Sequence, residues 1–94
     1  MLSQIPVDLT KLKKEDLDKE ILRVAIIAEL DAVNLYEQLA ALTGNEDIRK
    51  VFLDIAKEEK THVGEFQTML LRIDQEQVEE MEHGREEVKE LTGK

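Results

Sequence analysis

The stretch DIAKEEKTHVGEFQTML, residues 54–70, places a carboxylate and an imidazole on the apolar face of an expected helix. Apolar residues recur here every three or four positions, the spacing of one face of an amphipathic helix. Glu59 and His62 fall on that face, one turn apart, so their side chains converge, whereas Glu58 and Lys60 point away. The stripe consists of Phe52, Ile55, Glu59, His62, Phe66, Met69 and Ile73.

A second long helix is expected before this one, over residues 13–42, and it carries a similar polar interruption. Its stripe reads Leu22, Ile26, Glu29, Val33, Tyr36 and Ala40. Burying an unpaired carboxylate costs several kcal/mol, so three ionisable groups on core-facing stripes need compensating partners.

The segment TGNED, residues 43–47, predicts a tight turn between the two helices. Gly44 suits a left-handed position after the first helix, and Asn45 suits the cap of the second, expected over 46–73. Glu29 precedes Gly44 by 15 residues, and Glu59 follows it by 15. At about 1.5 Å per residue, the two carboxylates come level in an antiparallel hairpin. Glu29, Glu59 and His62 are therefore expected to converge.

Carboxylate oxygens and a neutral imidazole nitrogen are suitable ligands for iron, manganese or zinc. A di-iron carboxylate bundle uses a Glu from each of two helices and Glu-x-x-His from each of the other two. One chain supplies half of that set, and two chains related by a two-fold axis supply all of it. The non-metal alternative for Glu59 and His62 is a buried hydrogen-bonded pair that fixes dimer register. For Glu29 it is a salt bridge, although the stripes offer no Lys or Arg.

A third, weaker helix is expected over residues 75–91, with a thin apolar edge formed by Val78, Met81, Val88 and Leu91. The fold class is therefore all-α, an antiparallel two-helix hairpin plus a short C-terminal helix, in one domain spanning 1–94. A hairpin buries one stripe of each helix and leaves its other side open, so dimerisation is expected to complete a four-helix bundle.

Composition limits the partners. The net charge is −9, and eight acidic residues face two basic ones between positions 74 and 90. This surface repels phosphate backbones and anionic lipid, so neither nucleic acid nor membrane is expected as a partner. No Cys is present, which excludes disulfides, thiolate zinc sites and iron–sulfur clusters and is compatible with the cytoplasm. The chain has no 18-residue apolar run and no secretory signal at its start.

Three further residues are candidates or bystanders. Tyr36 lies seven residues after Glu29 on the same face; its hydroxyl could donate to a metal-bound carboxylate, or Tyr36 could be an ordinary core residue. Asp31 lies off the stripe and could line a path for cations. His83 has no stripe partner and is expected on the surface.

The segments IIAELDAVNLYEQLA (26–40) and DIAKEEKTHVGEFQTML, with the spacing of 30 between Glu29 and Glu59, resemble the encapsulated ferritins, the ferritin-like cargo of encapsulin nanocompartments. The resemblance covers nearly the whole chain, including the short third helix. It implies a two-helix half-ferritin whose ferroxidase centre forms between two chains, in dimers that assemble into a ring, commonly a decamer. The implied iron ligands are Glu29, Glu59 and His62 of both subunits, with Tyr36 as the aromatic beside the centre.

The sequence departs from that family at several positions. Ala28 replaces an acid of the outer site where metal enters, and Asp31 matches the other acid, which implies a weaker site; Leu35 replaces a common aromatic. The ending KELTGK is not the apolar docking peptide of free-standing cargo, which suggests a domain fused to the encapsulin shell protein.

These features predict a ferroxidase that oxidises Fe²⁺ with O₂ inside an encapsulin iron-storage compartment of the cytoplasm. Iron is the expected metal, and other divalent cations are possible. The alternatives are a rubrerythrin-like di-iron peroxidase, made less favourable by the absence of Cys, and a non-catalytic helical dimerisation module. Metal binding by the three ligands would distinguish either enzyme from the non-catalytic dimerisation module.

Overall fold

A computed structural model describes residues 13–94 and contains three helices and no strand in that range. Helix α1 spans Lys14–Leu42, α2 spans Glu46–Ile73 and α3 spans Gln75–Thr92. The expected all-α class is confirmed, and the helix bounds lie within one residue of those expected. The prediction that the domain extends over residues 1–94 includes residues 1–12, which lie outside the described part.

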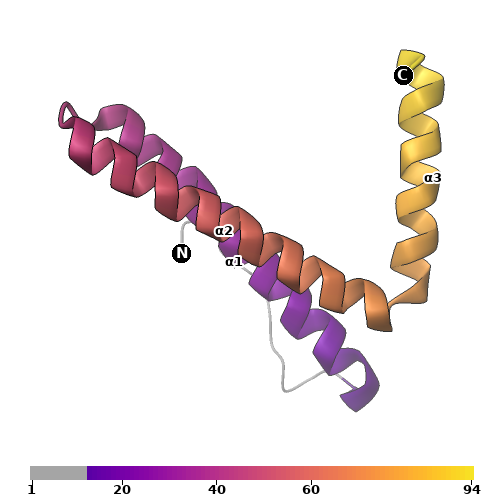
Figure 1. The fold of residues 1–94 in the computed structure, drawn as a ribbon. Coiled ribbons are helices and arrows are strands. Elements are labelled where there is room, and N and C mark those ends of the chain that lie inside the picture. The colour runs from indigo at the N-terminus through magenta and orange to yellow at the C-terminus, as the bar shows by residue number, and fades with distance from the viewer. Residues whose placement is uncertain (1–12) are drawn as a thin grey trace.

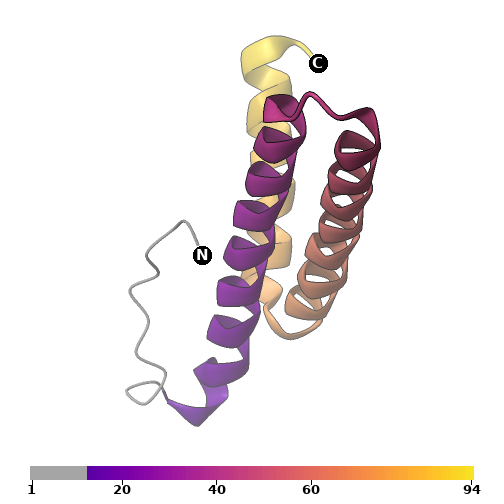
Figure 2. The same cartoon turned by 90° about the vertical axis from the view of Figure 1, so that its left-hand side faces the viewer.

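Helices α1 and α2 form the expected antiparallel hairpin, lying side by side along most of their length (Figures 1 and 2). The apolar residues buried between them are few: Val33, Ala40, Ala56 and Leu70. No large side chain among the described residues is fully buried. The hairpin core is therefore thin, and much of the apolar surface of both helices remains open in one chain.

The turn between α1 and α2 is held by side-chain caps. The Asn45 side chain accepts hydrogen bonds from the backbone N–H groups of Asp47 (2.9 Å) and Ile48 (3.1 Å), which confirms its expected role as the cap of α2. Such caps stabilise a helix by about 1 kcal/mol.

The prediction that Gly44 adopts a left-handed conformation is wrong. The one described residue with positive φ is Gly93, after α3. Thr43 ends α1 in an extended conformation, and the Arg49 guanidinium reaches back to donate to the carbonyls of Ala40 (3.0 Å) and Thr43 (2.8 Å). Because Arg49 satisfies these end carbonyls, the chain does not need the left-handed turn that would otherwise satisfy them.

Several large apolar side chains that the stripes placed in a core are exposed in one chain. Met69 and Ile73, at the end of the α2 stripe, are 48% and 44% exposed, and Val51 on the same edge is 58% exposed. We call Ile48, Val51, Ile55, Met69 and Ile73 the open edge of α2. It runs along most of the helix, and a second helix pair would be needed to cover it.

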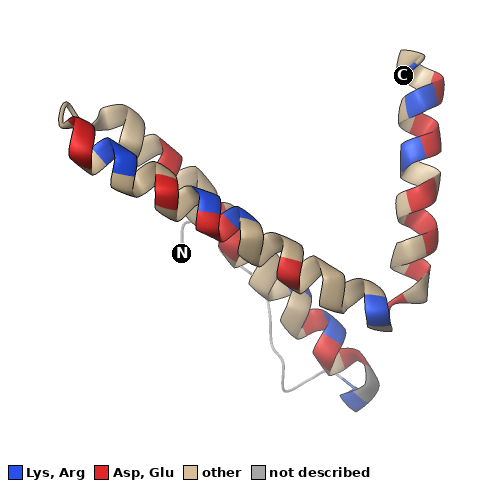
Figure 3. Ribbon diagram, in the orientation of Figure 1, with Lys and Arg blue, Asp and Glu red and all other residues tan. Residues whose placement is uncertain are grey.

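Helix α3 stands away from the hairpin and meets α2 near the corner that joins them (Figures 1 and 2). Val78, Val88 and Leu91 on its apolar edge are exposed, and Met81 is half-buried. Acidic residues recur along its length (Figure 3). Helix α3 therefore has no core of its own within the chain.

His83 lies exposed on α3, as expected, and its Nδ1 lies 3.3 Å from Glu80 Oε2. This hydrogen bond with Glu80 raises the pKa of His83 above 6.5, and the nearby charges of Glu80, Glu86 and Glu79 raise it further. Because the pKa is raised, the stabilisation of α3 by protonated His83 is fully present below pH 6.5 and is lost as pH rises through the folded pKa.

Glu80→Gln is expected to lower the His83 pKa, because it removes the hydrogen-bonded carboxylate and its charge. An NMR titration of the two histidines measures this directly. Glu82→Gln is the matched control, since Glu82 carries the same charge but pairs with Arg85 (3.1 Å) rather than with His83. An unchanged His83 pKa in Glu80→Gln would contradict the assignment.

Candidate metal centre

The structure brings Glu29 of α1 together with Glu59 and His62 of α2. One ligand atom from each residue lies within 4.8 Å of the other two. His62 Nδ1 is 3.1 Å from Glu59 Oε2 and 3.5 Å from Glu29 Oε2. The turn at residues 43–45 brings the two glutamates level, and the three-residue spacing on α2 sets His62 one turn from Glu59.

The members of this cluster differ in their exposure to solvent. The Glu29 and Glu59 side chains are each 20% exposed, whereas that of His62 is 44% exposed. On α2, His62 lies at the middle of the open edge, with Ile55 before it and Met69 after it. The carboxylates are thus held within the hairpin, while the imidazole faces the side that the chain leaves uncovered.

Glu29 supplies the test of whether a cation fits here. Its Oε2 is buried and accepts no hydrogen bond from a described residue. A buried acceptor without a partner costs about 1–3 kcal/mol, and a charged one costs more. The salt bridge to Lys or Arg considered as an alternative for Glu29 is not formed with a described residue. Two carboxylates and an imidazole around this orphaned oxygen suit a divalent cation, and the residues present therefore fit iron.

Tyr36 packs two turns along α1 from Glu29, towards the hairpin turn. Its ring stacks on Phe52 of α2, with centroids 6.0 Å apart and 24° between the planes. Phe52 precedes Glu59 by the same seven residues by which Tyr36 follows Glu29, so the stack forms an apolar layer next to the cluster. This packing supports the core role for Tyr36; a role at the metal stays a prediction.

Asp31 is half-buried on α1 and is not one of the three clustered residues. The role of Asp31 in metal uptake also stays a prediction.

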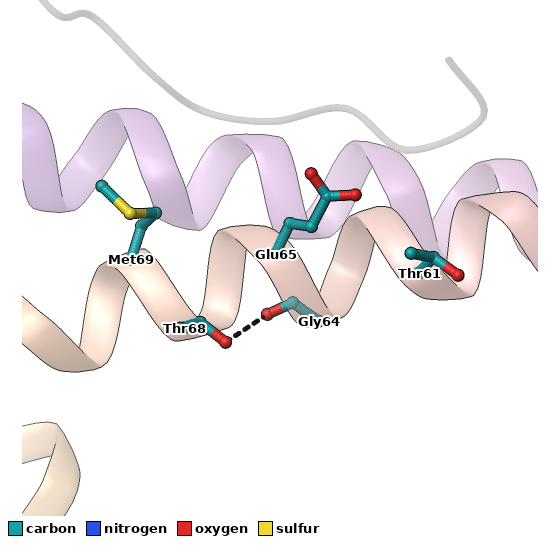
Figure 4. Close-up of a pocket in the computed structure, with 5 residues that line it drawn as sticks. All are labelled: Thr61, Gly64, Glu65, Thr68 and Met69. Carbon is teal, nitrogen blue, oxygen red and sulfur yellow. Dashed lines mark hydrogen bonds between the residues drawn. The ribbon is translucent and has the colours of Figure 1, made fainter.

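A shallow hollow of about 550 Å³ lies along α2 (Figure 4). It is lined by Thr61, Gly64, Glu65, Thr68 and Met69, and the Thr68 hydroxyl donates to the Gly64 carbonyl (2.7 Å). Gly64 contributes no side chain to the hollow, and a Cβ added there would meet no atom within 4 Å. None of the three clustered residues lines it.

Sequence reasoning gave no role to Asp74, the one buried charged residue of the described chain. Its side chain accepts a hydrogen bond from Arg23, 51 residues away (2.9 Å). The position of Asp74 at the junction of two expected helices is a signal that could have identified it as a cap, but nothing in the sequence indicates its distant partner.

The fold and the cluster together match one half of the arrangement found in di-metal carboxylate bundles: a helical hairpin with Glu on one helix and Glu-x-x-His on the other. The rubrerythrin family matches residues 20–92. A solved structure, the encapsulated ferritin domain from Pyrococcus furiosus, is 54% identical and superposes with a TM-score of 0.85, covering 100% of this chain and 98% of that one. The chain therefore belongs to the rubrerythrin family, and this likeness places it among the encapsulated ferritins.

Relatives identified by sequence are also associated with encapsulins. The chain is 64% identical over 80 residues to a ferritin-like–encapsulin shell fusion protein of Pyrococcus furiosus, covering 85% of this chain and 23% of that protein. It is 39% identical over 56 residues to the encapsulin nanocompartment cargo protein EncC of Myxococcus xanthus, covering 60% of this chain and 43% of that protein. The chain thus spans less than half the length of these relatives. In the described residues, no helix is both long and apolar enough to cross a membrane.

Proposed function

We propose that the chain is a ferroxidase that oxidises Fe²⁺ to Fe³⁺ at a di-iron site formed between two subunits. The observation that carries the proposal is the orphaned Glu29 Oε2 within a cluster whose third member, His62, faces the uncovered side of the hairpin. One chain offers three ligands, and a second copy related by a two-fold axis would supply three more. Glu29, Glu59 and His62 of both subunits would hold the iron.

Each part of the site has a distinct task in this reaction. Iron is the substrate and supplies the redox chemistry: two Fe²⁺ each lose one electron, and O₂ accepts the pair. The carboxylates balance the positive charge of the ions, and His62 supplies a neutral donor from the open edge. The stack of Tyr36 on Phe52 closes the site along the bundle axis with apolar surface. The likeness to an encapsulated ferritin domain supports this assignment over zinc or manganese.

The proposed assembly is a homodimer that forms a larger ring, a decamer by analogy with the family, inside an encapsulin shell in the cytoplasm. The open edge of α2 supports the first step, because burying it against a second copy would complete the four-helix bundle. The encapsulin-associated relatives support the shell as partner. Storage of the oxidised iron would take place within that shell, since a short helical bundle encloses no cavity of its own.

The rubrerythrin family match favours one alternative, a di-iron peroxidase using the same three ligands. The two functions differ in oxidant. Faster oxidation of the iron by hydrogen peroxide than by O₂ would favour the peroxidase.

Crystals grown with Fe²⁺, and measured on both sides of the iron absorption edge, test the site directly. We expect anomalous density for two iron ions between Glu29, Glu59 and His62 of paired chains. The absence of iron there at saturating Fe²⁺ would contradict the proposal and favour a non-catalytic dimerisation module.

Truncation after Ile73 tests the role of α3 in the ring. We expect the dimer and its iron site to remain and the larger ring to dissociate, because the exposed edge of Val78, Met81 and Val88 would pack between dimers. Light scattering and the iron-oxidation rate report the two effects separately. A ring that survives truncation would show that α3 is only a charged appendage, whose attraction for Fe²⁺ fades as salt increases.

A further inference from the structure

Asp74 joins all three helices through its own atoms. Its backbone N–H donates to the Leu70 carbonyl (3.0 Å) and ends α2. Its Oδ1 accepts from the Gln77 N–H (3.1 Å) and caps α3, while its Oδ2 accepts from Arg23 Nη2 of α1 (2.9 Å). It is 6% exposed, so this carboxylate is withdrawn from water at the point where α3 changes direction.

Within one chain, little else fixes the direction of α3 relative to the hairpin. In the described chain, the backbones of α1 and α3 do not approach each other, and α3 meets α2 at the corner alone. A cavity of about 250 Å³ lies inside this corner, between Ile26 of α1, Leu70 of α2 and Met81 of α3. The side-chain contact that spans it is a weak one, from Gln67 Nε2 to Met81 Sδ (3.8 Å). Apolar packing therefore leaves room for α3 to pivot.

We propose that the Arg23–Asp74 pair is an orientation latch, which holds α3 at a fixed angle to the hairpin. Arg23 reaches Asp74 from α1, so the pair links the two helices whose backbones do not touch. Among the described residues, it is the one side-chain hydrogen bond between α1 and the corner before α3, and it acts on a carboxylate that already accepts a hydrogen bond from the α3 backbone at Gln77. Tilting α3 would pull this carboxylate away from Arg23.

At neutral pH, Asp74 is ionised and the Arg23–Asp74 pair is formed. The hydrogen bond from the Gln77 N–H lowers the pKa of Asp74 below 3.8, and the Arg23 hydrogen bond and the charge of Lys19 lower it further. The charged groups facing Asp74 from α1 are Arg23 and Lys19, and Glu20 lies 3.6 Å from Arg23. For a lowered pKa, the contribution to stability is fully present above the ordinary value and is lost as pH falls through the folded pKa. Asp74 and Arg23 are thus positioning residues rather than a physiological pH sensor.

Pulsed electron–electron double resonance, which measures the distance between two spin labels, tests the latch on the full chain. Because the chain has no Cys, Asn34→Cys on α1 and Glu90→Cys on α3 give two defined spin labels at exposed positions. Labelled chains are diluted with unlabelled chains, so that distances within one chain dominate. We expect a single narrow distance peak for the doubly labelled chain in which Arg23 and Asp74 are both unchanged.

Asp74→Asn and Arg23→Gln are each expected to abolish that narrow peak and give a broad distribution. Asparagine keeps the capping oxygen for the Gln77 N–H, so a change in Asp74→Asn reports on the charged pair rather than on the cap. Arg23→Lys keeps a positive charge and is expected to restore part of the narrow peak. Arg85→Gln is the matched control, because Arg85 forms an exposed pair with Glu82 within α3 and should leave the peak unchanged.

The proposal is overturned by either of two results. A narrow peak that persists in Asp74→Asn or Arg23→Gln would show that the corner is rigid without the pair. Equal broadening of the distance distribution in Arg85→Gln would show that α3 responds to any loss of charge. Circular dichroism of each variant establishes that the helices are intact, and the iron-oxidation rate should not change, since neither latch residue is a proposed ligand.

Discussion

Replacing Glu29, Glu59 or His62 with alanine is expected to abolish rapid oxidation of Fe²⁺. Each side chain supplies one of the three donor atoms that lie within 4.8 Å of one another, and in a dimer each substitution removes two ligands at once. Loss of groups that merely support a ligand costs about 10–100-fold in metal affinity or activity, so loss of a ligand pair should cost at least as much. Stopped-flow absorbance of Fe³⁺ formation, under air and at neutral pH, measures the effect.

Glu58→Ala is the matched control for these variants. Glu58 neighbours Glu59 in sequence, carries the same charge and is exposed on the side of α2 away from Glu29. It should therefore retain most of the oxidation rate. Equal loss in Glu58→Ala and Glu59→Ala would show that the assignment of the helical face is shifted and that acidic charge alone governs the rate.

The stability of the metal-free protein should respond in the opposite direction to activity when Glu29 is changed to glutamine instead of alanine. Glu29→Gln removes the negative charge and puts an N–H donor in place of a buried oxygen that has no hydrogen-bond partner among the described residues. The relieved penalty is about 1–3 kcal/mol, so the melting temperature of the apo-protein is expected to rise while activity falls. A rise in stability with loss of activity is the behaviour of a ligand; a fall in both would indicate that Glu29 is a structural residue.

Fe²⁺ is expected to drive association of the chain, because a site shared by two subunits binds metal more tightly in the dimer. An ion bound only by the dimer, at 100 times its dissociation constant, stabilises that state by about 2.7 kcal/mol. Native mass spectrometry of the apo-protein, with and without Fe²⁺ under anaerobic conditions, should show monomer converting to dimer and larger rings.

His62→Ala provides the control for metal-driven association. The variant keeps the open apolar edge but lacks the ligand on that side, so Fe²⁺ should no longer shift its distribution towards dimer. A wild-type distribution that does not change on addition of Fe²⁺ would count heavily against a shared site. An equal shift in His62→Ala would mean that iron acts through the acidic surface rather than through the cluster.

The sequence by itself determined the helices and the level of the cluster along them. Periodicity of three and four residues marks which face each side chain occupies, and the 15-residue distances on either side of Gly44 fix which residues stand opposite each other in a hairpin. Both are local or nearly local properties, so the convergence of Glu29, Glu59 and His62 followed from the spacing of residues alone. The Asn45 cap is equally local, because its side chain bonds to N–H groups two and three residues ahead.

Tertiary structure alone decided three other features. Gly44 is not left-handed because Arg49, a turn inside the next helix, reaches the carbonyls that such a turn would have satisfied. The exposure of Met69 and Ile73 depends on how much surface one hairpin can cover, which periodicity does not reveal. The direction of α3 rests on Asp74 and Arg23, 51 residues apart. A hydrogen bond over that separation leaves no periodic trace in the sequence, because it forms only once the hairpin has brought the start of α1 beside the end of α2.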